Sequence, residues 1–322
     1  MEKNIDVSVV IPLYNEEGNV AELYRELKGV LIQENISHEI LFVNDGSSDR
    51  TTQLISEFYS KDSCVTVINF RRNFGQTAAM SAGFDYARGE IIVTMDGDLQ
   101  NDPADIPVLL AKIAEGYDVV TGWRFARKDP FISRKLPSII ANKIISFITG
   151  VHLHDYGCTL KAFKKEITQN IKLYGEMHRF IPAIASGMGA SIAEVKVNHR
   201  ARKYGTSKYG ISRTVRVILD LVTVKFLLSY SNRPLHVFGM IGLFSFTLGI
   251  FLLMFLGIQR QLYGIPMGDR PMLMMAVLVI FIGVQFITIG LVSEIQVRTY
   301  HESQNKPIYY VKNILKSEST LS

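Results

Sequence analysis

The stretch Ile91-Ile92-Val93-Thr94-Met95-Asp96-Gly97-Asp98-Leu99-Gln100 joins a run of apolar residues to two carboxylates that flank a glycine. A short apolar run rich in β-branched residues is typical of a buried strand in a parallel sheet. Gly97 allows a sharp turn at the carboxyl end of this strand, which is where open α/β sheets bind ligands. Carboxylate and amide oxygens suit Mg²⁺ or Mn²⁺, whereas the simpler alternative is a surface Asp-Gly turn. The apolar strand before the turn favours a metal and nucleotide site.

Strand and helix patterns alternate through the first half of the chain. This order is typical of βαβ units and predicts a mostly parallel sheet. A further helix is expected over 135–149 and an edge strand over 191–198. The other predicted strands are 7–11, 40–44, 65–69, 91–95 and 119–121, and the helices between them are 20–34, 51–60, 77–87 and 106–115.

Two long apolar runs, 235–258 and 272–295, contain no Asp, Glu, Lys or Arg before Glu294. Each would span about 35 Å as a helix, enough to cross a hydrocarbon core of roughly 30 Å. A buried helix of a soluble protein is the alternative, but two such runs in tandem favour membrane spans. Before them, 211–230 has a helical pattern with one narrow polar stripe. That pattern fits an interfacial helix and a helix packed on the soluble domain equally well.

The sequence therefore predicts four segments: a soluble domain over 1–209, a juxtamembrane amphipathic helix over 210–232, a transmembrane hairpin over 233–298 and a cytoplasmic tail over 299–322. The formal net charge of +5 is too small to favour a nucleic-acid partner. The first residues lack a signal-peptide pattern, and the two cysteines fit a reducing compartment. Basic residues flank the hairpin, whereas the connecting segment 259–271 has only Arg260 and Arg270. The positive-inside rule then predicts a cytoplasmic soluble domain and cytoplasmic termini, consistent with a bacterial inner membrane.

Polar and turn-forming residues also follow the first two predicted strands. Pro12, Tyr14 and Glu16 follow the first, and Asp45-Gly46-Ser47-Ser48-Asp49 follows the second. Ser48 or Asp49 alone would be explained as the cap of the next helix. Together with the acidic turn, these residues predict a binding site at one edge of the sheet. The sequence has neither a G-x-G-x-x-G after the first strand nor a P-loop, which argues against a dinucleotide oxidoreductase and a P-loop NTPase.

These motifs resemble those of family 2 glycosyltransferases of the GT-A fold. The resemblance rests on Val-Val-Ile-Pro-Leu-Tyr-Asn-Glu at 9–16, Asp-Gly-Ser-Ser-Asp at 45–49 and Asp-Gly-Asp-Leu-Gln at 96–100. The chain is more narrowly similar to polyprenyl-phosphate glycosyltransferases, such as bactoprenol glucosyltransferases and dolichyl-phosphate mannose synthases. This similarity rests on the two apolar runs and on Gly122-Trp123-Arg124, Ser133-Arg134 and His154-Asp155-Tyr156-Gly157-Cys158. It implies an α/β fold with a Rossmann-like, mostly parallel sheet, an interfacial helix and two transmembrane helices.

The resemblance also implies roles for individual residues. Asp96, Asp98 and Asp155 would be catalytic: Asp96 borders the sugar, and Asp98 holds Mg²⁺ or Mn²⁺ with Gln100. Asp155 would orient the acceptor, assist a proton or bond the sugar hydroxyls. The nucleotide would be bound by Pro12, Tyr14, Glu16 and Asp45. The acceptor phosphate would be contacted by Arg124 and Arg134. The loop that closes over the donor would contribute Arg200, Arg202, Ser207 and Lys208. For Arg124 and Arg134 the simpler alternative is an exposed salt bridge.

The expected function is metal-dependent, inverting transfer of a hexose from a nucleotide sugar to polyprenyl (undecaprenyl) phosphate at the cytoplasmic membrane face. UDP-glucose is the preferred donor, with a mannose or a modified-pentose transferase as alternatives. The donor's diphosphate would repel the acceptor phosphate, and bidentate arginines offset that repulsion. A processive polysaccharide synthase fits less well, because the single tryptophan, Trp123, is not in a Q-x-x-R-W motif.

Two further expectations concern partners. A non-catalytic membrane partner with a degenerate nucleotide fold is disfavoured because both carboxylates and the amide of the acidic turn are intact. Glycines seven residues apart, Gly242 with Gly249 and Gly283 with Gly290, give each apolar run a small-residue face. These faces predict either packing within the hairpin or a homo-oligomer in the membrane lipid.

Overall fold

A computed structural model describes residues 5–125, 136–171, 173, 177–201, 234–266, 268, 270–303 and 311–315. The chain divides into two compact units, one formed by 1–224 with 307–322 and the other by 225–306. The first unit contains the sheet, and the second contains two long helices.

One eight-stranded sheet forms the centre of the first unit, in the order β7-β5-β6-β4-β1-β2-β3-β8. β1 pairs in parallel with β2 and β4, and β2–β3 and β5–β7 are parallel too. β6 and β8 run antiparallel to their neighbours. This is the mostly parallel α/β sheet that the sequence predicts. The bounds are β1 Val7–Leu13, β2 His38–Asn44, β3 Val65–Phe70, β4 Ile91–Thr94, β5 Val119–Arg124, β6 Lys161–Lys164, β7 Ile192–Val197 and β8 Val311–Leu315.

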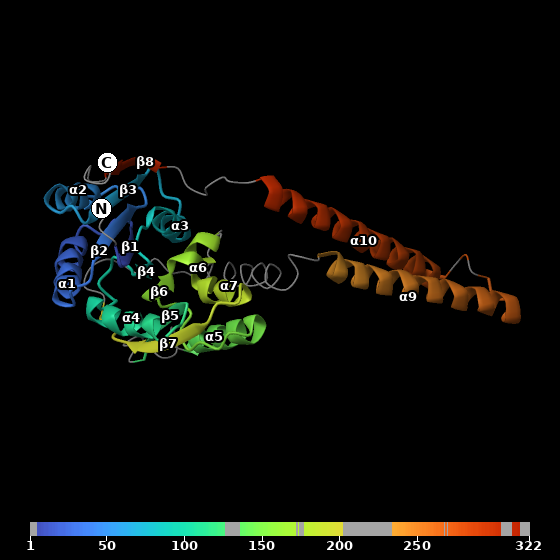
Figure 1. The fold of residues 1–322 in the computed structure, drawn as a ribbon. Helices are drawn as coiled ribbons and strands as arrows, with labels where there is room; N and C mark the ends of the chain where they lie inside the picture. The colour runs from blue at the N-terminus through green and yellow to red at the C-terminus, as the bar shows by residue number, and fades with distance from the viewer. Residues whose placement is uncertain are drawn as a thin grey trace. The chain divides into compact units, whose positions relative to one another are not determined.

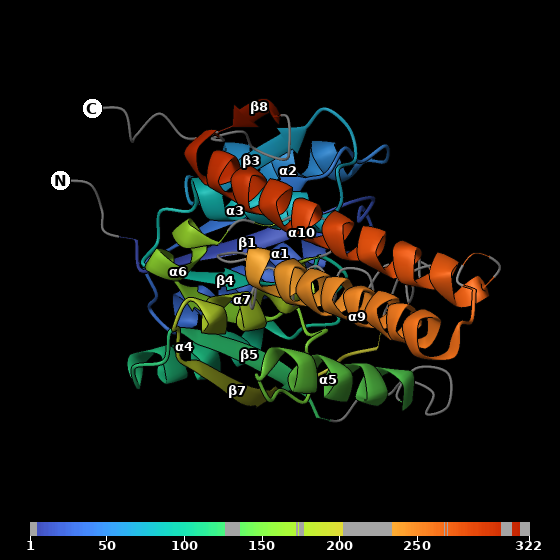
Figure 2. The same ribbon diagram turned by 90° about the vertical axis from the view of Figure 1, so that its right-hand side faces the viewer.

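Helices cover both faces of this sheet (Figures 1 and 2). α1 (Val20–Gln33), α2 (Thr51–Lys61) and α4 (Ile106–Ala114) contribute apolar side chains to a buried core on one face. On the other face lie α3 (Gln76–Tyr86), α6 (Lys165–Asn170) and α7 (Ile181–Gly187), where Phe84 packs edge-on against Phe163. Because both faces are covered, the central strands are mostly apolar and are buried along nearly their whole length. Among the described residues, the other elements of this unit are η1 Pro103–Asp105, α5 Leu136–Thr149 and η3 Met177–Phe180.

Two strands are absent from the sequence prediction. β6 begins with Lys161, whose side chain is buried, and a lysine there gives no strand signal. β8 belongs to the predicted tail over 299–322, but its backbone pairs with β3 and places Leu315 opposite Val67. Side chains of an edge strand stay largely exposed, so they carry little apolar pattern. The predicted interfacial helix over 210–232 lies outside the described residues.

The second unit is a helical hairpin of α9 (Pro234–Tyr263) and α10 (Pro271–Ser303). Its candidate membrane spans are Phe238–Tyr263 and Pro271–Ser293, and only 17% and 11% of their most apolar windows are buried. That exposure is unlike the core helix of a soluble protein. An ideal Cβ on Gly242 would lie 2.7 Å from the Gly283 oxygen, so these glycines let α9 and α10 approach closely. The hairpin itself therefore uses this small-residue face.

Candidate active site

The ends of three neighbouring strands meet at one edge of the sheet. β1 lies between β2 and β4, so the residues that follow these strands are adjacent. The amide of Asp45 donates to the Leu13 carbonyl at 2.8 Å, and the Met95 amide donates to the Val10 carbonyl at 3.2 Å. The structure thus brings together the acidic turn and the residues after the first two strands.

The acidic turn after β4 has an uncommon backbone conformation. Leu99 has a φ of 62°, a left-handed value that a residue with a large side chain seldom adopts. The Gln100 amide donates to Oδ1 of Asp98 at 3.1 Å, which closes the turn. A Cβ on Gly97 would lie 2.4 Å from Cδ2 of Leu13. Glycine at 97 therefore allows close packing against Leu13 of β1, and the chain turns at Gly97 and Asp98, as expected, before the left-handed Leu99.

Negative charge is concentrated in this turn. Asp98 is 7% exposed, and Asp96 accepts a hydrogen bond from Nε2 of Gln76 at 2.7 Å. Burial, followed by the charge of Asp98, raises the pKa of Asp96 to about 6. No three His, Cys, Asp or Glu side chains among the described residues form a metal-binding group. The oxygen donors of Asp98 and Gln100 still fit a hard divalent cation, because such ions usually bind one or two carboxylates plus substrate phosphates.

Asp45 is buried and holds the loop that follows β3. Its two carboxylate oxygens accept hydrogen bonds from the amides of Phe74 at 2.6 Å and Gly75 at 2.9 Å. Burial raises the pKa of Asp45, although these two amides act in the opposite direction. Gly46 beside it has a φ of +71°, and a Cβ there would lie 2.5 Å from the Arg72 carbonyl carbon. Any other residue at 46 would push this loop away from β2.

The loops after β1 and β2 are joined by side-chain to backbone contacts. The Asn15 amide donates to Oγ of Ser47 at 3.0 Å, and the Ser48 amide donates to Oδ1 of Asn15 at 2.8 Å. Asp49 accepts from the Thr51 amide at 3.0 Å, so it is Asp49 that bonds the first turn of α2. The other residues expected to bind the nucleotide also lie here. Pro12 is the second-last residue of β1, and Tyr14, just after this strand, is 36% exposed. Glu16 accepts a hydrogen bond from the Asn19 side chain at 2.6 Å.

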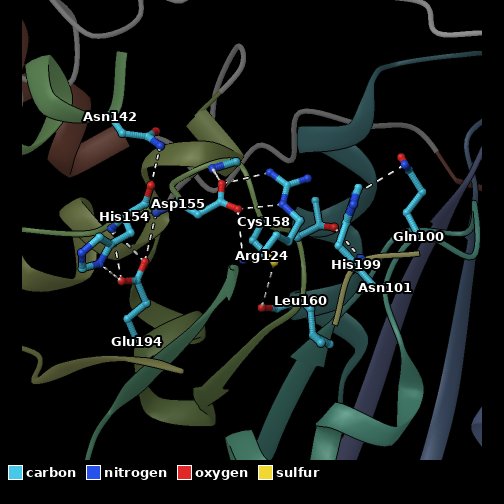
Figure 3. Close-up of polar contacts among 12 residues, drawn as sticks. Gln100, Asn101, Arg124, Asn142, His154, Asp155, Cys158, Leu160, Glu194 and His199 are labelled. Atoms are coloured by element: carbon cyan, nitrogen blue, oxygen red, sulfur yellow. Dashed lines mark hydrogen bonds and ion pairs between the residues drawn. The ribbon is translucent and has the colours of Figure 1, made fainter. Parts of the chain in front are cut away.

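Arg124 at the end of β5 forms a bidentate ion pair with Asp155 (Figure 3). Its Nε donates to Oδ2 at 2.7 Å and its Nη2 donates to Oδ1 at 2.9 Å. The two side chains are 16% and 3% exposed, so this is not the exposed surface salt bridge that the sequence left open. Burial acts to lower the pKa of Arg124, but the bonds to Asp155 outweigh it and raise the pKa above its usual range. Arg124 is therefore a fixed positive charge.

A second buried cation lies beside this pair. Lys161 starts β6, opposite Thr94 of β4 and Thr121 of β5, and is 2% exposed. Its Nζ donates to the Cys158 carbonyl, and burial lowers its pKa. Burial also raises the pKa of the Cys158 thiol to about 11. The sequence prediction missed Lys161 and Gln76, because neither residue belongs to a recognisable motif.

The basic segment after β7 is described only as far as residue 201. Within it, Arg200 donates to Glu26 at 2.5 Å and to Asp102 at 2.7 Å. Its amide also donates to the Gln100 carbonyl at 3.0 Å, which places this segment beside the acidic turn. Arg134, Arg202, Ser207 and Lys208 lie outside the described residues, so their expected roles stay predictions.

Comparisons with known proteins agree with this architecture. Residues 8–172 match the model of the glycosyl transferase family 2. The chain is 44% identical to the dodecaprenyl-phosphate galacturonate synthase of Rhizobium johnstonii, over 98% of this chain and 95% of that one. It is 38% identical to the undecaprenyl-phosphate 4-deoxy-4-formamido-L-arabinose transferase of Shewanella sediminis, over 99% of this chain and 95% of that one.

Solved structures share the fold at low sequence identity. Glucosyl-3-phosphoglycerate synthase from Mycobacterium tuberculosis, in complex with Mn²⁺, UDP and phosphoglyceric acid, gives a TM-score of 0.54 at 16% identity over 70% of this chain and 78% of that one. Mannosyl-3-phosphoglycerate synthase from Rubrobacter xylanophilus gives 0.57 at 17% identity, over 69% and 74%. At such low identity, these likenesses show a shared fold.

Proposed function

The chain belongs to glycosyl transferase family 2, and we propose that it transfers a modified pentose or a uronic acid from a nucleotide sugar to a polyprenyl phosphate. The observation that carries this proposal is similarity over almost the whole chain, the two apolar helices included, to two transferases named for polyprenyl-phosphate acceptors. A lipid acceptor explains why one chain carries both a sugar-nucleotide fold and a hydrophobic hairpin.

Glucose, the sugar expected from the sequence, is not favoured by these relatives. Their names specify galacturonate and 4-deoxy-4-formamido-L-arabinose. The alternative of a modified pentose fits these relatives better, and a uronic acid is a second candidate for the transferred sugar. Uridine is the proposed nucleotide, because structures with this fold hold UDP.

On the donor side, Asp98 and Gln100 would hold a divalent cation, which supplies positive charge to the departing diphosphate. Asp96 lies two residues before Asp98 and is oriented by Gln76, so it borders the place for the sugar. Asp45 keeps the loop over 71–75 against the sheet, which preserves the shape of the nucleotide side.

On the acceptor side, Arg124 offsets the charge of an incoming phosphate. Its Nε and Nη2 bond Asp155, which leaves Nη1 outside the pair and fixes the plane of the guanidinium. Both oxygens of Asp155 already accept hydrogen bonds, one of them also from the Gly157 amide at 3.1 Å. These contacts favour a role for Asp155 in holding Arg124 over a role as a base that accepts a proton. A phosphate acceptor is ionised near neutral pH, so no strong base is needed.

A donor panel tests this function. Membranes that contain the full chain would be supplied with polyprenyl phosphate and, separately, UDP-galacturonate, UDP-4-deoxy-4-formamido-L-arabinose, UDP-glucose and GDP-mannose. We expect a lipid-linked product from one of the first two donors and none in matched membranes without the chain. Product from UDP-glucose alone would restore the hexose prediction, and no product from any donor would favour a non-catalytic partner.

The cytoplasmic location of the first unit is part of the proposal and has its own test. Cys158 is fully buried, so its failure to react with a thiol reagent would say nothing about topology. We therefore place cysteines at two exposed positions, Gly268→Cys in the hairpin connection and Ser60→Cys in α2. An impermeant maleimide should label the first in intact cells and the second only after permeabilisation. The opposite pattern would place the first unit outside.

A further inference from the structure

Glu194, on strand β7, contacts the segment that carries Asp155 (Figure 3). One carboxylate oxygen accepts the amide of Asp155 at 3.0 Å and the amide of His154 at 2.9 Å. The other accepts the His154 amide at 3.1 Å and lies 2.6 Å from its Nδ1. The Glu194 side chain is only 11% exposed, whereas the His154 side chain is 65% exposed. A largely buried carboxylate is thus used to hold two consecutive backbone amides.

These contacts anchor Asp155 at both ends. Its amide is bound by Glu194 of β7, and its carboxylate is bound by Arg124 of β5. The two strands are direct neighbours, with Glu194 opposite Thr121 and Val197 opposite Arg124. The spacing between the two anchors is therefore set by sheet register. Residues 150–160 have no helix or strand of their own, so side-chain contacts determine where Asp155 lies.

We propose that Glu194 is a positioning residue: it fixes the backbone of Asp155, and through Asp155 it sets the direction of the Arg124 guanidinium. This inference rests on the proposed function, in which Arg124 faces the acceptor phosphate. A carboxylate is suited to the task because both of its oxygens only accept hydrogen bonds. A glutamine keeps only one of these two oxygens, and its NH₂ group would replace the second oxygen, so that one donor would face another at the His154 amide.

A double-mutant cycle tests whether Glu194 acts through Asp155. Glu194→Gln should lower kcat roughly 10- to 100-fold, because a displacement of about 1 Å in a catalytic group costs that much. UDP affinity, measured by calorimetry, should stay unchanged, since the Asp45 loop is untouched. Glu194→Gln combined with Asp155→Asn should be no slower than Asp155→Asn alone. Additive losses, or loss of UDP binding in Glu194→Gln, would overturn the proposal.

His154→Gln is the matched control, because it removes the ring but leaves both backbone amides for Glu194. Its kcat should stay within a few-fold of wild type. Equal losses in His154→Gln and Glu194→Gln would mean that the ring contact, and not the backbone anchor, matters.

Trp123 gives a signal that does not depend on turnover. It is the single tryptophan of the chain, and His154 stacks on it with centroids 4.1 Å apart and planes at 16°. Releasing the segment in Glu194→Gln should change the Trp123 emission spectrum. An unchanged spectrum would show that the segment stays in place and would overturn the proposal, even if no donor were turned over. Absence of wild-type turnover would instead count against the proposed function.

Discussion

The two halves of the candidate site are held by different interactions. On the side of β1, β2 and β3, side chains bond backbone amides, as Asp45 does with Phe74 and Gly75. On the side of β5, β6 and β7 there is in addition a buried ion pair, Arg124 with Asp155, and Glu194 bonds the backbone amide of Asp155 in turn. The first arrangement fixes the shape of loops. The second fixes the position of charge.

This difference suits the two substrates that we propose. A nucleotide is recognised by a cavity of defined shape, which the hydrogen bonds from the Phe74 and Gly75 amides to Asp45 help to preserve. A phosphate acceptor needs a positive charge at a defined place, and a buried ion pair orients that charge at the expense of desolvation. Substitutions on the two sides should therefore fail in different ways.

The largest effect is expected at the acidic turn between the two halves. Asp98→Asn keeps the shape of the side chain but removes its charge, so turnover should fall about 1,000-fold or more through loss of the cation. Asp118→Asn is the matched control, because Asp118 precedes β5 at the opposite edge of the sheet. Mn²⁺ binding by electron paramagnetic resonance should be lost only in Asp98→Asn. Chelator-resistant turnover would contradict the expectation.

A smaller loss is expected on the charged side. Arg124→Lys keeps the positive charge but cannot form the bidentate pair, so kcat/KM for the lipid acceptor should fall about 100-fold. UDP affinity should not change, which separates this side from the nucleotide side. Equal loss of UDP binding and acceptor use would place Arg124 in the donor site instead.

On the nucleotide side, a change of shape alone should weaken binding. Gly46→Ala introduces a methyl group against the Arg72 backbone at a position with φ +71°, so UDP affinity should fall about 10-fold. Gly116→Ala has a φ of +109° with open space around the Cβ, and it lies after α4. It should lower the thermal midpoint slightly and leave UDP affinity unchanged. Similar UDP affinities in the two variants would mean that the loop adapts.

The smallest effect is expected in the pH dependence of stability, and it involves Asp118, which is not part of either side of the site. Hydrogen bonds from Lys164 and Ser191 lower the pKa of Asp118 from 3.8 to about 2. Because the folded value is the lower one, this contribution to stability is complete above pH 4 and disappears as the pH falls toward 2. Asp118→Asn should remove that part of the acid dependence of the thermal midpoint, measured by circular dichroism. If the thermal midpoints of wild type and Asp118→Asn fell equally as the pH is lowered, the contacts of Asp118 with Lys164 and Ser191 would make no contribution.

Much of the fold was predictable because its signals are local. Apolar strands followed by amphipathic helices identify β1 to β5, and the two apolar runs identify α9 and α10. The acidic turn was predictable because a carboxylate pair after an apolar strand is unusual. Gly97 lies in the expected turn, but its close packing against Leu13 of β1 was not indicated by any local pattern.

Local patterns along the chain encode the order of elements and the residues that follow each strand, since periodicity and turn chemistry act between near neighbours. Which of those residues meet depends on how the strands pair in three dimensions. The pairing of Arg124 with Asp155, the anchoring of Asp155 by Glu194 and the burial of Lys161 join residues on β5, β6, β7 and the segment before β6. β8 is likewise defined only by its pairing with β3. Such contacts depend on strand order and register, which a sheet acquires when distant strands pair and which no local pattern encodes.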